Sequence, residues 1–97
     1  MNSDQIKKTI KEKIQKRIDG RNTDTFLFGS FARGQHFHDI DIGVIGARAD
    51  QLAALREDFE ESTFPYEVDI VDFSSADNQF KSKIFDNGVL WLTRKKN

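Results

Sequence analysis

The stretch LFGSFARGQHFHDIDI, residues 27–42, decides the fold of this 97-residue chain. It opens on the end of a short apolar run, 25–28, which predicts a buried strand closed by Gly29. Residues 30–34 predict a turn and a short helix. Residues 39–45 alternate polar and apolar side chains, which predicts a second strand. We therefore expect two strands, joined through a Gly-Ser turn, at the centre of the fold.

The flanking sequence predicts further helices and strands. Isoleucines spaced four residues apart predict an amphipathic helix over 4–19, capped by Ser3 or Asp4 and ended by a left-handed Gly20. The remaining predicted elements are a helix over 50–61 capped by Asp50, a strand over 66–72, a helix over 76–86 capped by Ser74 or Ser75, and a last strand or docked tail over 89–92. This order predicts an α+β fold with an α/β-like succession and its helices packed on one face of the sheet.

Length and composition exclude several classes of protein. We expect one domain over 1–97, with a basic amphipathic helical start, 1–23, and a solvated tail, 94–97. The absence of cysteine excludes a disulfide framework, a thiol nucleophile and a Cys-ligated zinc site. A net charge of -1 disfavours a general nucleic-acid binder. No membrane span or signal peptide is recognisable, so a cytoplasmic location is expected.

Three aspartates and one turn form the candidate site. Asp39 and Asp41 are two residues apart, so their side chains project from the same face of their strand. Asp69 joins them if its strand lies next to theirs. Carboxylates gathered in this way suit Mg²⁺, which takes one or two carboxylates together with substrate phosphates. The Gly29-Ser30 turn is suited to cradle phosphate through its backbone N–H groups and hydroxyl. The alternative is a solvent-facing row of carboxylates on a one-sided strand.

These motifs resemble those of a known family. Gly29-Ser30, Asp39-x-Asp41 and Asp69 are similar to the signature of the nucleotidyltransferases of the DNA polymerase β superfamily. More narrowly, residues 27–34, 39–42 and 65–73 resemble the minimal nucleotidyltransferase (MNT) proteins. The resemblance covers nearly the whole chain. It implies a small mixed sheet with an active site at its edge.

The resemblance also implies an activity and a role for each residue. Such enzymes use two Mg²⁺ ions, with Mn²⁺ as a substitute, to transfer a nucleoside monophosphate from an NTP to a hydroxyl and release pyrophosphate. We expect AMP from ATP. The implied roles are phosphate binding by Gly29 and Ser30, binding of both ions by Asp39 and Asp41, and binding of one ion with activation of the acceptor hydroxyl by Asp69. Arg33 is either a phosphate contact or a surface salt-bridge partner.

A partner subunit is expected, because a chain this short leaves no room for the helical domain that holds base and acceptor in larger relatives. The resemblance implies a small helical HEPN protein in a hetero-oligomer, as in toxin–antitoxin pairs where the MNT protein attaches AMP to a HEPN ribonuclease. Membrane or direct nucleic-acid binding is not expected. The loop between Ser30 and Asp39 has eight residues, fewer than the family usually has. That favours an alternative in which an inactive MNT fold inhibits its partner by occlusion; transfer to a small molecule is a weaker third interpretation.

Other residues keep more than one interpretation. His36 and His38 could be transition-metal ligands, loop residues near the triphosphate, or plain surface. Asp72 alternates onto the face opposite Asp69, which predicts a cap or strand-end residue and not a ligand. Trp91 is either core or interface. The segment around it and the open edge of the sheet are candidate docking surfaces.

Overall fold

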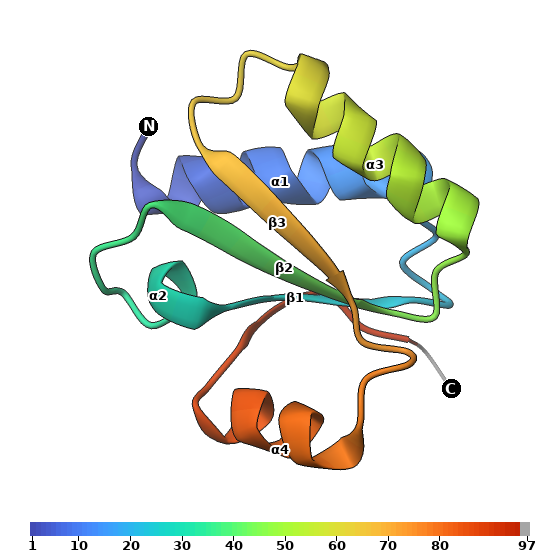
Figure 1. Ribbon diagram of the computed structural model, residues 1–97. Coiled ribbons are helices and arrows are strands. Elements are labelled where there is room, and N and C mark those ends of the chain that lie inside the picture. Colours follow the sequence, from blue (N-terminus) through green and yellow to red (C-terminus); the bar gives the residue numbers. More distant parts are fainter. Residues whose placement is uncertain (96–97) are drawn as a thin grey trace.

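The computed structural model describes residues 1–95 as four helices and one four-stranded sheet (Figure 1). The elements are α1 (Ser3–Arg17), β1 (Asp24–Phe28), α2 (Gly29–Ala32), β2 (Asp39–Ile45), α3 (Ala49–Glu61), β3 (Glu67–Asp72), α4 (Asn78–Asp86) and β4 (Leu90–Thr93). Within these residues the strand order is β3-β2-β1-β4, with β2 parallel to β3 and the other pairs antiparallel. The predicted α+β fold with a small mixed sheet is confirmed.

One face of the sheet, the helical face, is covered by α1 and α3, which lie side by side above it (Figure 1). The strands present aliphatic side chains to these helices, and isoleucines four residues apart on α1 pack against them. Every fourth residue of a helix stays on one side, so the spacing buries the whole row. The main buried members are Ile6, Ile10, Ile14, Leu27, Ile40, Ile42, Val44, Leu52, Leu55 and Ile70.

The prediction that all helices share one face is wrong for α4. This helix lies on the other side of the sheet (Figure 1), where Phe26, Phe28 and Phe73 form a separate aromatic core. β1 is apolar at consecutive positions, so both of its faces need cover. Gly43 makes this packing possible, because a Cβ at that position would overlap the Phe26 ring.

The first helix differs from the prediction at both ends. It starts at Ser3, because Asn2 is the N-cap: its side chain accepts from the Gln5 N–H in a capping box. It ends at Arg17, where Ile18 turns extended, and Gly20 does not adopt the left-handed conformation.

The caps of α3 and α4 also differ. α3 starts after Arg48, and Asp50 lies in the first turn, where it pairs with the Arg48 guanidinium. α4 starts after Asp77, whose carboxylate accepts from the Phe80 N–H. Ser74, one of the predicted caps, instead accepts from the Gly46 N–H through its hydroxyl. Local sequence offers several polar residues near each helix start, and tertiary contacts select among them.

The last strand is confirmed at the outer edge beside β1. Trp91 remains 38% exposed there, with its ring stacked 5.8 Å from Phe85 and the Arg94 guanidinium 4.3 Å above it. The predicted solvated tail, 94–97, falls partly outside the described residues; of its described part, Arg94 packs on Trp91 and the Lys95 N–H donates to Asp24. No helix in residues 1–95 is long and apolar enough to cross a membrane.

Candidate active site

The parallel pairing of β2 and β3 brings the acidic residues together. Asp41 lies directly beside Asp69 in the register, and Asp39 lies beside Glu67. Alternate residues of a strand share a face, so all four carboxylates project from the same side of the sheet. This side, the acidic face, also carries Phe26, Phe28 and Phe73 under α4. The condition set for Asp69, that its strand should neighbour β2, is met.

These carboxylates differ in how exposed they are to solvent. Asp39 and Asp69 are exposed, whereas Asp41 is half-buried. Asp41 lies opposite Phe28, the last residue of β1, and next to the start of α2. α4 covers the Gly43 end of the acidic face and leaves the Asp39 end uncovered. The acidic cluster is therefore reachable from solvent, with one wall of the site made by the end of β1.

Electrostatics single out Asp41. Burial makes the largest contribution to raising the pKa of its carboxyl, and the neighbouring Asp69 and Asp39 raise the pKa further. Arg33 acts in the opposite direction and lowers the pKa of Asp41. A bound cation would offset the same repulsion, so the free site has a built-in preference for positive charge.

The turn into α2 packs against this carboxylate. Gly29 has a φ of 75°, and a Cβ there would overlap the Asp41 carboxylate, so any other residue would be both strained and obstructed. Ser30 follows in the first turn of the helix, where backbone N–H groups have no partner within the helix. Arg33 is exposed on the loop that leaves α2, and its Nε lies 3.4 Å from the Gln35 side-chain oxygen. Gly29 and Asp41 are thus in contact, and Ser30 and Arg33 flank them.

The donor set suits Mg²⁺. In residues 1–95 no three His, Cys, Asp or Glu side chains are arranged to hold a metal ion by themselves. Carboxylate oxygens are nevertheless the ligands Mg²⁺ prefers, and that ion completes its shell with water and substrate phosphate. Asp39 and Asp41, with Asp69 beside them, are the residues that would hold it. His36 and His38 lie in the loop before β2 with their rings 5.4 Å apart.

Two residues near the site were not singled out from the sequence. Glu67 stands beside Asp39 and extends the acidic row; its position two residues before Asp69 could have revealed it, since both must share a face. Arg56 donates from α3 to the Ile70 backbone carbonyl at 3.0 Å, a contact with no sequence signal. Asp72 is confirmed as a strand-end residue, because its carboxylate accepts from the Ser74 N–H.

Comparison with known families agrees with this geometry. Residues 5–97 match the family described as polymerase beta nucleotidyltransferase. The chain belongs to this family. The family resemblance inferred from residues 27–42 and Asp69 is thereby confirmed. No curated protein sequence matches the chain.

Three similar solved structures come from toxin–antitoxin complexes. The first, described as a toxin–antitoxin with AMP-PNP, is 25% identical to this nucleotidyltransferase chain, with a TM-score of 0.70. The match covers 93% of this chain and 74% of the chain in that structure. The second, a tri-AMPylated Shewanella oneidensis HEPN toxin with its MNT antitoxin, is 22% identical with a TM-score of 0.71, at 97% and 74% coverage. The third, an MntA-HpeT complex with two aspartates changed to glutamate, is 20% identical with a TM-score of 0.70, at 93% and 74% coverage. The fold is that of the MNT antitoxins.

Proposed function

We propose that this chain transfers AMP from ATP, with Mg²⁺, to a hydroxyl group on a partner protein of the HEPN type, and so acts as an antitoxin. The observation that carries the proposal is the register of β2 and β3, which sets Asp41 beside Asp69 on an uncovered part of the sheet. The contact between Gly29 and the Asp41 carboxylate adds the turn suited to phosphate to the same place. Family membership supplies the reaction type.

The chemistry requires one bond to form and one to break. The acceptor oxygen bonds to the α-phosphorus of ATP, the bond from that phosphorus to the bridging oxygen breaks, and pyrophosphate leaves. The chemistry that Mg²⁺ would supply when bound is stabilisation of charge on the attacking and leaving oxygens. Asp39 and Asp41 would hold the ions, Asp69 would bind one of them, orient the acceptor hydroxyl and take up its proton, and Ser30 and the backbone N–H groups after Gly29 would bind the outer phosphates. Arg33 lies close enough to Asp41 to lower its pKa, which supports a phosphate contact.

The partner and the nucleotide are proposed from the similar structures. Among the similar structures, one holds AMP-PNP and another is a HEPN toxin that carries AMP and is bound to an MNT antitoxin. These descriptions favour ATP as the donor and a helical HEPN protein as the acceptor. Two Mg²⁺ ions, a hetero-oligomer and a cytoplasmic location belong to the same proposal.

Calorimetric titration of ATP, with and without Mg²⁺, tests the site. We expect Mg²⁺-dependent binding by the wild-type chain and none by the double variant Asp39→Asn, Asp41→Asn. Asp72→Asn is the matched control. It also removes a carboxylate from β3, but Asp72 lies on the helical face and not in the acidic cluster. Equal binding by the double variant would refute the site.

Transfer itself is tested with a HEPN partner. We expect the partner to gain the mass of AMP in the presence of Mg²⁺ and ATP, and to gain none with Asp41→Asn. The eight-residue loop between Ser30 and Asp39 favours the second candidate, inhibition by occlusion. If Asp41→Asn still neutralises the partner fully, occlusion replaces transfer as the function.

A further inference from the structure

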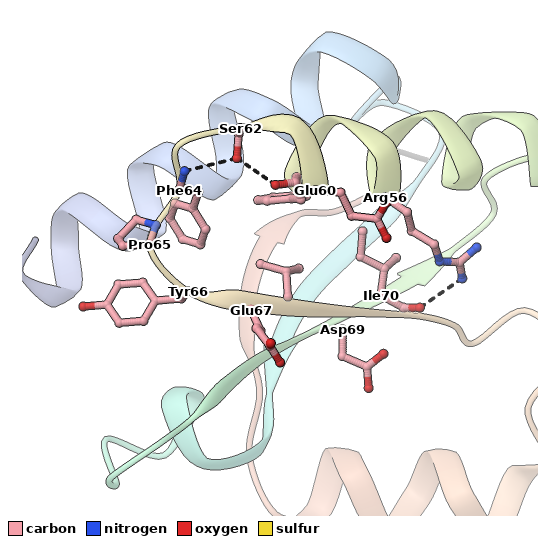
Figure 2. Close-up of a pocket in the computed structure, with 11 residues that line it drawn as sticks. Arg56, Glu60, Ser62, Phe64, Pro65, Tyr66, Glu67, Asp69 and Ile70 are labelled. Carbon is pink, nitrogen blue, oxygen red and sulfur yellow. Dashed lines mark hydrogen bonds between the residues drawn. The ribbon is translucent and has the colours of Figure 1, made fainter.

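A groove runs along the open edge of β3 and contains one of the proposed catalytic carboxylates. It has a volume of about 480 Å³ and lies between β3, the end of α3 and the loop that joins them (Figure 2). In Figure 2, Glu67 and Asp69 point to one side of β3, while Arg56 and Glu60 lie on the other side with α3. The groove, called here the β3 groove, therefore spans the sheet edge from the helical face to the acidic face.

The backbone at this edge is open to a further strand. Within the described residues β3 pairs only with β2, so its other side is unpaired. The Ile70 carbonyl points outward, because Arg56 of α3 donates to it at 3.0 Å. Since N–H and C=O groups alternate in direction along a strand, the N–H and C=O of Val68 also point outward. Arg56 closes the edge at Ile70, which leaves the outward N–H and C=O of Val68 free, next to Asp69.

Side chains along this stretch divide between two surroundings. Val68 and Ile70 face α3, where Phe59 and Phe64 form an apolar wall with ring centroids 5.7 Å apart. Glu67 and Asp69 face the opposite way, onto the acidic face. An added strand would have the same alternation. Its side chains would alternately meet the apolar wall and come to within about 5 Å, Cβ to Cβ, of Glu67 and Asp69.

The charge of the groove restricts what it can hold. Its lining carries the carboxylates of Glu60, Glu67 and Asp69 against the single guanidinium of Arg56, which is engaged with the Ile70 carbonyl. An acidic lining repels a nucleic-acid strand and attracts lysine or arginine. The favoured occupant is a polypeptide whose apolar side chains alternate with basic ones.

We propose that the β3 groove binds the acceptor as an extended polypeptide segment, added to β3 as a fifth strand, with a hydroxyl side chain opposite Asp69. The proposal rests on the proposed function, since it names how the acceptor reaches that site. Backbone hydrogen bonds to Val68 provide affinity, and the alternating apolar and acidic surroundings select the segment. A hydroxyl at the position opposite Asp69 then meets the carboxylate that takes up its proton.

The test uses a synthetic peptide in which valine alternates with lysine about a central serine, whose short side chain places its hydroxyl at the level of the Asp69 carboxylate. We expect it to bind the wild-type chain, measured by fluorescence anisotropy, and the same peptide with glutamate in place of lysine to bind at least about tenfold more weakly. No binding of the lysine peptide would overturn the proposal. A chain that dimerises through β3 and thereby excludes the peptide would also overturn it.

Variants locate the binding. Glu67→Lys reverses a charge that the lysines of the peptide face and should weaken peptide binding at least about tenfold; the matched control Glu57→Lys, exposed on α3 outside the groove lining, should not. Val68→Pro removes the outward N–H, which an edge strand tolerates, and should have a similar effect once thermal unfolding confirms that it folds. Unchanged binding by Glu67→Lys would overturn the proposal whether or not Val68→Pro folds.

Different results would refute the proposed function and the peptide-binding role of the β3 groove. Absence of Mg²⁺-dependent ATP binding by the wild-type chain in calorimetry refutes the proposed function, whereas peptide binding is measured without nucleotide. With Mg²⁺ and ATP present, AMP should appear on the serine of the bound peptide and be absent from the peptide with alanine at that position. ATP binding without peptide binding would refute the β3 groove alone.

Discussion

The two faces of the sheet are built from the same strands but on opposite principles. The helical face is aliphatic and closed, with Ile40, Ile42 and Val44 of β2 fully buried beneath α1 and α3. On the acidic face the same strand presents Asp39 and Asp41, and only the far half is covered, by α4 over an aromatic core. The closed face provides stability, and this leaves the open half free to hold groups that repel one another. Changes to β2 should therefore have opposite consequences at neighbouring residues.

Ile42→Ala tests the closed face and should have the largest effect on stability. Ile42 is fully buried among α1, α3 and the neighbouring strands, so the variant loses apolar contacts and leaves a cavity. We expect the free energy of unfolding to fall by about 2–5 kcal/mol. Urea denaturation followed by circular dichroism measures it. A loss below about 1 kcal/mol would contradict the assignment of this face as the main core.

Gly43→Ala tests the covered half of the acidic face. A Cβ would overlap the Phe26 ring, which is fully buried against Phe73 and cannot move freely. We expect a loss of about 1–3 kcal/mol by the same measurement. Phe26→Leu in the Gly43→Ala background should recover part of that loss, and no recovery would mean that the overlap is not its cause.

Gly29→Ala tests the junction between the turn and the carboxylates, with Gly34→Ala as its control. Both glycines have positive φ, 75° and 71°, so each variant has a backbone strain of about 1–2 kcal/mol. Only Gly29 approaches Asp41; a Cβ at Gly34 meets nothing within 4 Å. We expect Gly29→Ala alone to lower Mg²⁺-dependent ATP affinity, by at least about tenfold in calorimetry. Equal affinity in the two variants would separate Gly29 from the site.

Asp41→Asn should have the smallest effect on stability and the opposite sign. The folded-state pKa of Asp41 is raised, mainly by burial, so its stabilising contribution is present at low pH and is lost as pH rises through that pKa. Asparagine has no carboxyl to ionise, so the variant does not lose stability as the pH rises. It should be more stable than the wild type at neutral pH by less than about 1 kcal/mol, because the site is half-exposed, and the difference should shrink toward low pH. Thermal unfolding across pH measures it, and a less stable variant at neutral pH would contradict the shift.

Local pattern predicted the strands better than it predicted the packing. The alternation over 39–45 gives both the bounds of β2 and the shared face of Asp39 and Asp41, since a period of two is a local property. The place of α4 is not local. It depends on Phe26, Phe28 and Phe73 meeting across β1 and the end of β3, and a single sequence shows only that each is apolar.

The candidate site was predictable in composition and less so in arrangement. Gly29, Ser30, Asp39, Asp41 and Asp69 follow from the motifs, whereas the proximity of Asp69 to Asp41 comes from the parallel register of β2 and β3. The sequence predicted the open edge of the sheet as a docking surface but not the walls of the β3 groove, because these come from α3 and the loop after it, and Arg56 reaches the Ile70 carbonyl from another element. Contacts of this kind depend on long-range geometry, and residue type alone does not encode them.

The position of Asp69 on an edge strand makes the site sensitive to local opening. Among the strands of residues 1–95, β3 pairs only with β2, so fraying of this one ladder would carry Asp69 away while Asp39 and Asp41 stayed in place. Any ligand that needs all three carboxylates must then bind the fraction of molecules in which the ladder is closed, and its binding keeps the ladder closed. Amide exchange along β3 would slow when such a ligand binds, so the edge of the sheet acts as a reporter of occupancy as well as a wall of the site.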